Sequence, residues 1–163
     1  MTKQEVLGWL EEVKDPEIPV LSLLDLGVIT EVELGEGKVR VEMTPTFVGC
    51  PAMDVMREEV ISVLKRHGID KAEVNVSLKT GWNSDRISEK GRAALKKYGL
   101  APPPALSGVI RDIDMLGHAV CPRCSGTNTV MRSPFGPTLC RSLHYCNDCR
   151  EAFEQFKPLG EAS

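Results

Sequence analysis

The sequence predicts an α+β protein, in which a small helix-covered domain with a three-stranded sheet is followed by a module built around four cysteines. Three observations support this class. Residues 28–43 and 72–78 alternate apolar and polar side chains, as half-buried strands do. The segments around them repeat apolar residues at helical spacing. Two Cys-x-x-Cys pairs lie in the last third of the chain.

The first helix is expected to begin after Thr2, because Thr2 and Glu5 have the spacing of a capping box. Three apolar residues at helical spacing follow, namely Val6, Leu10 and Val13. The helix should end by Asp15, since the residue before a proline is pushed out of the helical region. Ser22 can then cap a short helical turn that ends at Gly27.

Three strands make up the expected sheet. The first covers about residues 28–34, residues 35–37 form a hairpin turn, and the second strand covers residues 38–43. The third strand covers residues 72–78, after the central helix. A parallel return across that helix gives a small sheet with helices packed on one face.

Residues 44–53 connect the second strand to the central helix and contain Cys50. Pro51 suits the first position of a helix, so Cys50 is expected at the helix N-terminus. Unpaired N–H groups and the positive end of the helix dipole favour a thiolate there, which predicts a lowered pKa for Cys50. This interpretation makes Cys50 a reactive thiol. The alternative is a small buried residue under the turn.

A further helix is expected over residues 85–98, with Tyr98 facing inward. The run of prolines that follows favours a stiff, extended linker. We therefore divide the chain into a domain of residues 1–100, a proline-rich linker of residues 101–117 and a module of residues 118–163.

The module contains two Cys-x-x-Cys pairs, separated by 21 residues, whose members are Cys121, Cys124, Cys146 and Cys149. Each pair can present two sulfurs to one ion, and two pairs complete a tetrahedron, as in zinc ribbons. A module of about 40 residues buries too little core to be stable alone, so a structural metal is expected. Zinc is the default ion. A single iron uses the same ligands, and the sequence leaves this choice open.

Cys140 lies between the two pairs. It is interpreted as a small buried residue of the hairpin, because the tetrahedral site is already complete. The alternatives are a second reactive thiol that faces Cys50 and a ligand in an alternative metal state.

Composition limits the classes of function. The chain is 42% hydrophobic and 26% charged, and its net charge of −3 argues against nucleic-acid binding. It shows no signal-peptide pattern and no apolar run near the roughly 18 residues that span a bilayer. We expect a cytoplasmic protein whose six cysteines are ligands or thiols. Phosphate-loop, di-iron, flavin and nicotinamide motifs are absent, so independent catalysis is not expected.

Several motifs resemble a known family. This chain is similar to the small domain of iron–sulfur cluster assembly factors of the SufT type at residues 15–19, 25–27, 43–46 and 49–51. The PaaD family comprises the D subunits encoded with multicomponent phenylacetyl-CoA epoxidases. This chain resembles the PaaD family at residues 81–82, 87–92 and 98–103 and in the four-cysteine ribbon, including residues 133–141. The resemblance covers nearly the whole chain.

The resemblance implies a helper subunit of an oxygenase system in phenylacetate catabolism. Its partners would be a di-iron oxygenase and a reductase with flavin and a [2Fe–2S] cluster, whose metal centres it would help to mature. Cys50 would be the functional thiol, holding iron or an iron–sulfur cluster transiently or contacting the recipient protein. Asp15 and Thr46 would line the same site, whereas Glu17 is interpreted as a solvated charge.

Two other functions are compatible with the sequence. The chain could be a structural subunit that bridges partners through its ribbon, without metal transfer. It could also be a thiol oxidoreductase that uses Cys50 and Cys140, although Cys50 has no neighbouring resolving cysteine. A homodimer could bring two Cys50 thiols to one cluster.

Overall fold

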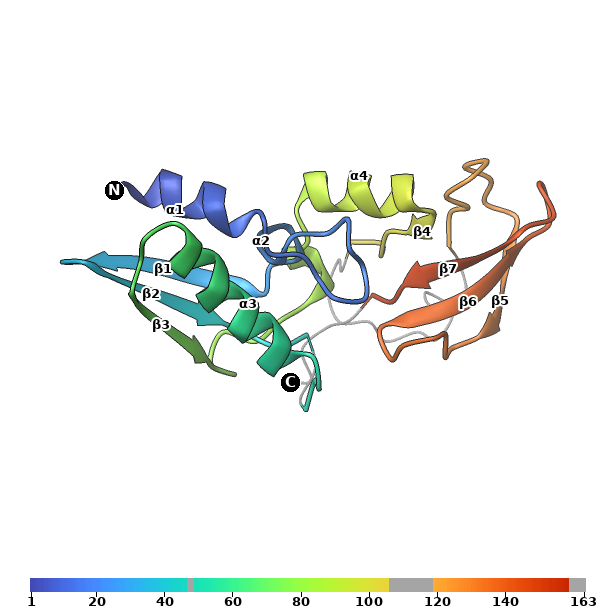
Figure 1. The fold of residues 1–163 in the computed structure, drawn as a ribbon. Helices are drawn as coiled ribbons and strands as arrows, with labels where there is room; N and C mark the ends of the chain where they lie inside the picture. Colours follow the sequence, from blue (N-terminus) through green and yellow to red (C-terminus); the bar gives the residue numbers. More distant parts are fainter. Residues whose placement is uncertain (47–48, 106–118, 159–163) are drawn as a thin grey trace. The chain divides into compact units, whose positions relative to one another are not determined.

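Figure 1 shows the computed structural model, which describes residues 1–46, 49–105 and 119–158. The chain divides into two compact units. The first unit contains Met1–Trp82 and Arg86–Gly91, and the second contains Asn83–Asp85 and Arg92–Ser163. This division falls within helix α4 (Glu89–Tyr98) and so differs from the expected end of the first domain at residue 100. Most of the expected linker, residues 106–117, lies outside the described residues.

The first unit is built on a three-stranded sheet in the order β1-β2-β3. Strands β1 (Ile29–Gly35) and β2 (Lys38–Met43) form the expected antiparallel hairpin. Helix α3 (Met53–Arg66) returns the chain, so that β3 (Lys71–Val76) pairs parallel to β2. Helix α1 (Lys3–Leu10) packs against α3 and β1, and both helices cover one face of the sheet (Figure 1). The predicted α+β class is confirmed.

The core of the first unit follows the two periodicities of its sequence. On β2, Val39, Val41 and Met43 are fully buried. On α3, five apolar residues at helical spacing are buried, namely Met53, Met56, Val60, Val63 and Leu64. The third strand is shorter than expected, since β3 ends at Val76 and Leu78 is 61% exposed. As an edge strand, β3 buries fewer side chains than β2 does.

Helix α1 begins where the sequence places it. The Glu5 amide donates a hydrogen bond to Thr2 Oγ1 (3.2 Å), and the Thr2 amide donates to Glu5 Oε2 (2.7 Å). The two contacts complete the predicted capping box, which satisfies amide groups that the first turn of a helix leaves unpaired.

Helix α4 begins later than expected. Residues 84–86 form a separate 3₁₀ turn, and α4 starts at Glu89. The reason is a cap: the Gly91 amide donates a hydrogen bond to Ser88 Oγ (2.9 Å). The expectation that Tyr98 faces inward is wrong, because its side chain is 48% exposed. The helix ends at that residue, and Leu100, in the next strand, is buried instead.

A short helical turn, α2 (Leu23–Leu26), anchors the loop that follows β3. Ser22 caps this turn and Gly27 ends it in a left-handed conformation, as expected. The Asp25 carboxylate accepts hydrogen bonds from the hydroxyls of Ser22 (3.0 Å) and Ser88 (2.6 Å). Two further side chains donate to backbone carbonyls at this turn, namely Trp82 to Leu26 (2.8 Å) and Arg86 to Gly27 (3.1 Å).

The second unit is built on a four-stranded sheet in the order β4-β7-β6-β5. Strands β5 (Thr129–Ser133), β6 (Arg141–Cys146) and β7 (Ala152–Phe156) are antiparallel neighbours, whereas β4 (Leu100–Ala101) is parallel to β7. One apolar cluster of its described residues contains Ala101, Ala119, Cys121, Cys146 and Phe153, with Cys149 packed against it. Leu95, Leu100 and Phe156 are also buried in this unit. A unit of this size buries a limited core, and a structural metal ion is a common further source of its stability.

We expect Gly27→Ala to destabilise the first unit more than the matched substitution Gly37→Ala. Both glycines have positive φ (+79° and +66°), so each alanine costs about 1 kcal/mol of backbone strain. A Cβ at Gly27 would also lie 2.6 Å from the Arg86 Cβ, whereas a Cβ at Gly37 meets nothing within 4 Å. Urea unfolding should show a loss of about 3 kcal/mol for Gly27→Ala and about 1 kcal/mol for Gly37→Ala. Equal losses would contradict the close packing of α2 on the loop.

Candidate metal centre and thiol site

The second unit brings the two cysteine pairs together in one cluster. The sulfurs of Cys121, Cys124, Cys146 and Cys149, which we call the four-cysteine cluster, all lie within 4.8 Å of one another. The Cys121 and Cys149 sulfurs are 3.7 Å apart, and those of Cys124 and Cys146 are 3.6 Å apart. In a tetrahedral zinc site with Zn–S bonds of about 2.3 Å, neighbouring sulfurs lie about 3.8 Å apart. The cluster therefore fits one tetrahedrally coordinated ion with four sulfur ligands.

Two backbone turns of similar shape build this cluster. The residue after each pair, Ser125 (φ 61°) and Arg150 (φ 59°), has the left-handed conformation that few non-glycine residues adopt. In the first turn, the Ser125 amide donates to the Cys121 carbonyl (2.9 Å). In the second, the Cys146 amide donates to the Glu151 carbonyl (2.9 Å). Each turn thereby directs both of its sulfurs toward the same point.

Gly126 allows the two turns to approach each other. Its amide donates a hydrogen bond to the Cys124 sulfur (3.3 Å). A Cβ at this position would lie 2.5 Å from an Asp148 carboxylate oxygen and 3.1 Å from the Cys124 sulfur. A side chain there would displace the Asp148 carboxylate and crowd the Cys124 sulfur, so glycine lets the second turn, which carries Asp148, lie close to the first.

The thiols of the cluster do not ionise independently. Burial and the neighbouring thiols raise the pKa of Cys149 to about 12. Burial also opposes ionisation of Cys121, but the backbone amides of Cys124 and Arg123 lower its pKa to about 7. Four thiolates this close repel one another, so a bound cation is what would let all of them ionise.

Cys140 lies apart from the four-cysteine cluster. It is buried, as expected, and its sulfur is 3.1 Å from Thr138 Oγ1. Cys140 and Cys146 are both buried cysteines of the same unit, which makes Cys140 a matched control for the cluster.

Cys50 lies outside helix α3 rather than at its first position. The helix begins at Met53, with Ala52 as its N-cap residue, so Cys50 precedes the cap by two residues. Its side chain is half-buried. The expectation of a lowered pKa is wrong. Burial raises the pKa of the Cys50 thiol, and the charges of Asp15 and Glu17 raise it further, against the opposing effect of the Ala52 and Met53 amides.

The loop at residues 15–18 is held by hydrogen bonds to Asp15, and the charges of its carboxylates act on Cys50. Asp15 Oδ1 accepts hydrogen bonds from the Glu17 amide (2.8 Å) and the Ile18 amide (2.9 Å), so Asp15 caps the loop. Its charge also acts on Cys50, as does that of Glu17. Glu17 is exposed, as expected of a solvated charge, and its charge also acts on the Cys50 thiol. The sequence separates these carboxylates from Cys50 by more than 30 residues, which hides the interaction.

Thr46 and Thr44 lie on the segment between β2 and Cys50. Thr46 is half-buried, and no hydrogen bond joins it to Cys50 among the residues that the structure describes. Thr44 was not singled out by sequence. It is 1% exposed, and its hydroxyl has no hydrogen-bond partner within the described parts of the chain. The feature of the sequence that could have indicated Thr44 is its position, because it directly follows the buried last residue of β2.

Comparison with known proteins identifies the family. Residues 113–157 match the family model described as the PaaD zinc beta ribbon domain, and residues 3–77 match that of an iron–sulfur cluster assembly protein. An Escherichia coli protein provisionally named as the D subunit of 1,2-phenylacetyl-CoA epoxidase is 35% identical over 94% of this chain and 91% of its own length. The chain belongs to the PaaD family. The predicted resemblance is confirmed.

Relatives of the first unit extend beyond the PaaD family. A Porphyromonas gingivalis protein described as an Fe-S protein maturation auxiliary factor is 36% identical over 58% of this chain and 90% of its own length. The crystal structure of a Bacillus anthracis domain of unknown function is similar with a TM-score of 0.54 and 29% identity. The similarity covers 57% of this chain and 90% of that domain. Among the described helices, none is long and apolar enough to cross a membrane.

We expect Cys146→Ser to lower the amount of bound metal, because it leaves three sulfurs where the geometry provides four. Elemental analysis should give about one ion per chain for the unaltered protein and less for this variant. The control Cys140→Ser should retain the full amount. Equal metal in both variants would place the ion elsewhere.

We expect Glu17→Gln to speed alkylation of Cys50 at neutral pH. Removing a negative charge that raises the thiol pKa increases the thiolate fraction, by about twofold for one partly screened charge. Iodoacetamide labelling, followed by mass spectrometry of the Cys50 peptide, measures the rate. Glu36→Gln, in the hairpin turn, should leave the rate unchanged. A slower or unaltered rate in Glu17→Gln would contradict the electrostatic link.

Proposed function

We propose that this chain is an accessory subunit of a multicomponent phenylacetyl-CoA epoxidase and assists maturation of an iron–sulfur or di-iron centre in that system. The observation that carries the proposal is the combination of two modules in one chain. The first unit resembles iron–sulfur assembly proteins and bears a half-buried cysteine, and the second unit carries the PaaD ribbon. The recipient would be the di-iron oxygenase or the flavin and iron–sulfur reductase of the epoxidase.

Cys50 would be the working thiol of the first unit. Its raised pKa keeps it mostly protonated at neutral pH, so it is a weak nucleophile until a cation displaces the proton. The charges of Asp15 and Glu17, which disfavour a thiolate, favour an approaching metal cation for the same reason. Iron or an iron–sulfur cluster would be the cargo, held transiently beside Asp15 and Thr46.

The four-cysteine cluster would hold a structural zinc ion. Four sulfurs with tetrahedral spacing suit zinc, and the same donors also accept a single iron. Zinc has no redox chemistry, so its contribution there would be to fold the ribbon and to present it to the epoxidase.

The test is complementation in cells that lack this chain and produce the other epoxidase components. Those components are purified without oxygen, and their iron and sulfide contents are measured. The unaltered chain and the control Cys140→Ser should restore the contents, whereas Cys50→Ser should leave at least one component deficient. The loss is expected because serine cannot replace a thiolate as an iron ligand.

Two results would contradict this proposal. Full restoration by Cys50→Ser would favour a structural subunit that bridges partners without metal transfer. A disulfide between Cys50 and Cys140 after mild oxidation, together with loss of function in both variants, would favour a thiol oxidoreductase.

A further inference from the structure

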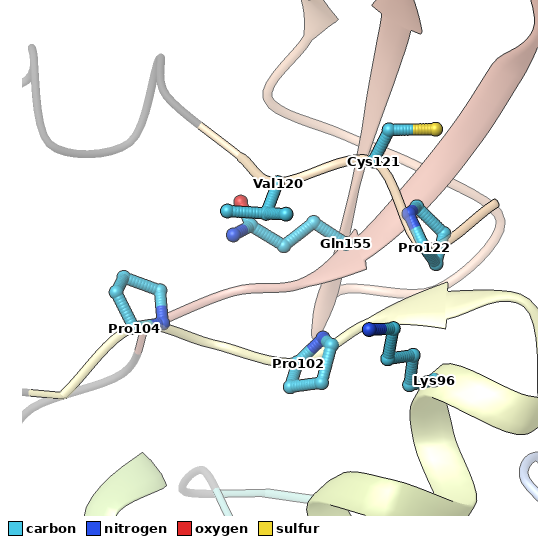
Figure 2. Close-up of a pocket in the computed structure, with 7 residues that line it drawn as sticks. All are labelled: Lys96, Pro102, Pro104, Val120, Cys121, Pro122 and Gln155. Carbon is cyan, nitrogen blue, oxygen red and sulfur yellow. The ribbon is translucent and has the colours of Figure 1, made fainter. Parts of the chain in front are cut away.

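The second unit contains a small pocket beside the first cysteine turn (Figure 2). Its volume is about 140 Å³. Six of the residues that line it are Lys96, Pro102, Pro104, Val120, Pro122 and Gln155. They come from α4, from the segment after β4, from the cysteine turn and from β7, and their side chains surround a common space in Figure 2. The proposed maturation role does not use this pocket.

Gln155 supplies the buried polar group of the pocket. It is 2% exposed, and its side-chain oxygen Oε1 has no hydrogen-bond partner in the described parts of the chain. Three of the surrounding residues are prolines, which have no N–H group to donate. A buried acceptor without a donor destabilises the folded state. The pocket therefore favours an occupant that brings a hydrogen-bond donor.

The size of the pocket limits that occupant to one ring. A cavity of about 150 Å³ in another protein holds benzene, whereas pockets for whole small molecules measure about 300–1,000 Å³. The proline and valine walls are apolar and suit the faces of a ring. Lys96 is exposed, and its ammonium makes a long contact of 3.5 Å with Ser125 Oγ. It can therefore turn to pair with a carboxylate on the occupant.

We propose that the pocket receives a tyrosine side chain of a partner protein, with a carboxylate next to that tyrosine. The phenol O–H donates to Gln155 Oε1, the ring packs against the prolines, and the carboxylate pairs with Lys96. Rotation about the last side-chain torsion of Gln155, which is broad and shallow, brings the oxygen to the donor. Single tyrosine anchors in small rigid pockets are common centres of protein interfaces, and proline walls lose little freedom on binding.

The inference is tested first on the unaltered, metal-loaded chain by NMR titration. The probes are N-acetyl-L-tyrosine, N-acetyl-L-phenylalanine and N-acetyl-L-tyrosinamide. N-acetyl-L-tyrosine should shift the amide signals of Val120, Cys121 and Gln155 with a Kd on the order of 1–10 mM, as expected for so small a ligand. N-acetyl-L-phenylalanine, which lacks the phenol hydroxyl, should bind about fivefold more weakly. N-acetyl-L-tyrosinamide, which lacks the carboxylate, should bind about twofold more weakly than N-acetyl-L-tyrosine at low salt.

Variants then assign each contact. Gln155→Met removes the acceptor and should abolish the preference for tyrosine over phenylalanine. Lys96→Met should abolish the effect of the carboxylate, and the control Lys97→Met, which does not line the pocket, should change neither. If Gln155→Met does not fold, the ligand series on the unaltered chain decides.

Three results would overturn the inference. They are phenylalanine binding as tightly as tyrosine, a preference for tyrosine that persists in Gln155→Met, and no saturable shift up to about 50 mM probe. The pocket and Cys50 are tested on different residues and by different readouts. Failure of either proposal therefore leaves the other standing.

Discussion

The second unit depends on the convergence of four sulfurs. Cys121 and Cys146 belong both to the four-cysteine cluster and to an apolar cluster of buried residues in this unit. The candidate metal site and this apolar cluster therefore share residues. In a unit of this size, a bound ion would add to the stabilisation that the apolar contacts provide. The left-handed residues after each pair and the missing side chain at Gly126 serve this one geometry.

The first unit is stabilised in a different way. Two helices cover one face of a sheet, and the turn at α2 ties the loop after β3 to this core through Asp25 and the close approach at Gly27. A core of this kind is stable enough to tolerate nearby polar groups that are buried or lack a hydrogen-bond partner. The raised pKa of Cys50 and the unpaired hydroxyl of Thr44 are two such features on the segment between β2 and α3. Such features are typical of functional sites.

The sequence was informative wherever the signal is local. Periodicity predicted β2 and α3, and capping residues predicted the start of α1 and the end of α2, because neighbouring residues determine these features. Features that depend on distant residues were missed. Strand β4 has only two residues and exists because β7 pairs with it. The pKa of Cys50 was predicted with the wrong sign, since burial raises it and since Asp15 and Glu17 act on it from a loop far away in the sequence.

Under the proposed function, that electrostatic environment suits metal binding at Cys50 better than thiol chemistry. Thiol–disulfide exchange needs a thiolate, and a raised pKa leaves little of it at neutral pH. Capture of a metal cation removes the proton in the same step that forms the sulfur–metal bond, so a protonated thiol slows it less. Without a cation, the charges of Asp15 and Glu17 disfavour the Cys50 thiolate, and with a bound cation the same charges attract it. In the proposed role, release to a recipient would be favoured by the return of a proton, because the raised pKa makes the Cys50 thiolate a ready proton acceptor. A thiol in this environment suits transient binding better than either catalysis or permanent storage.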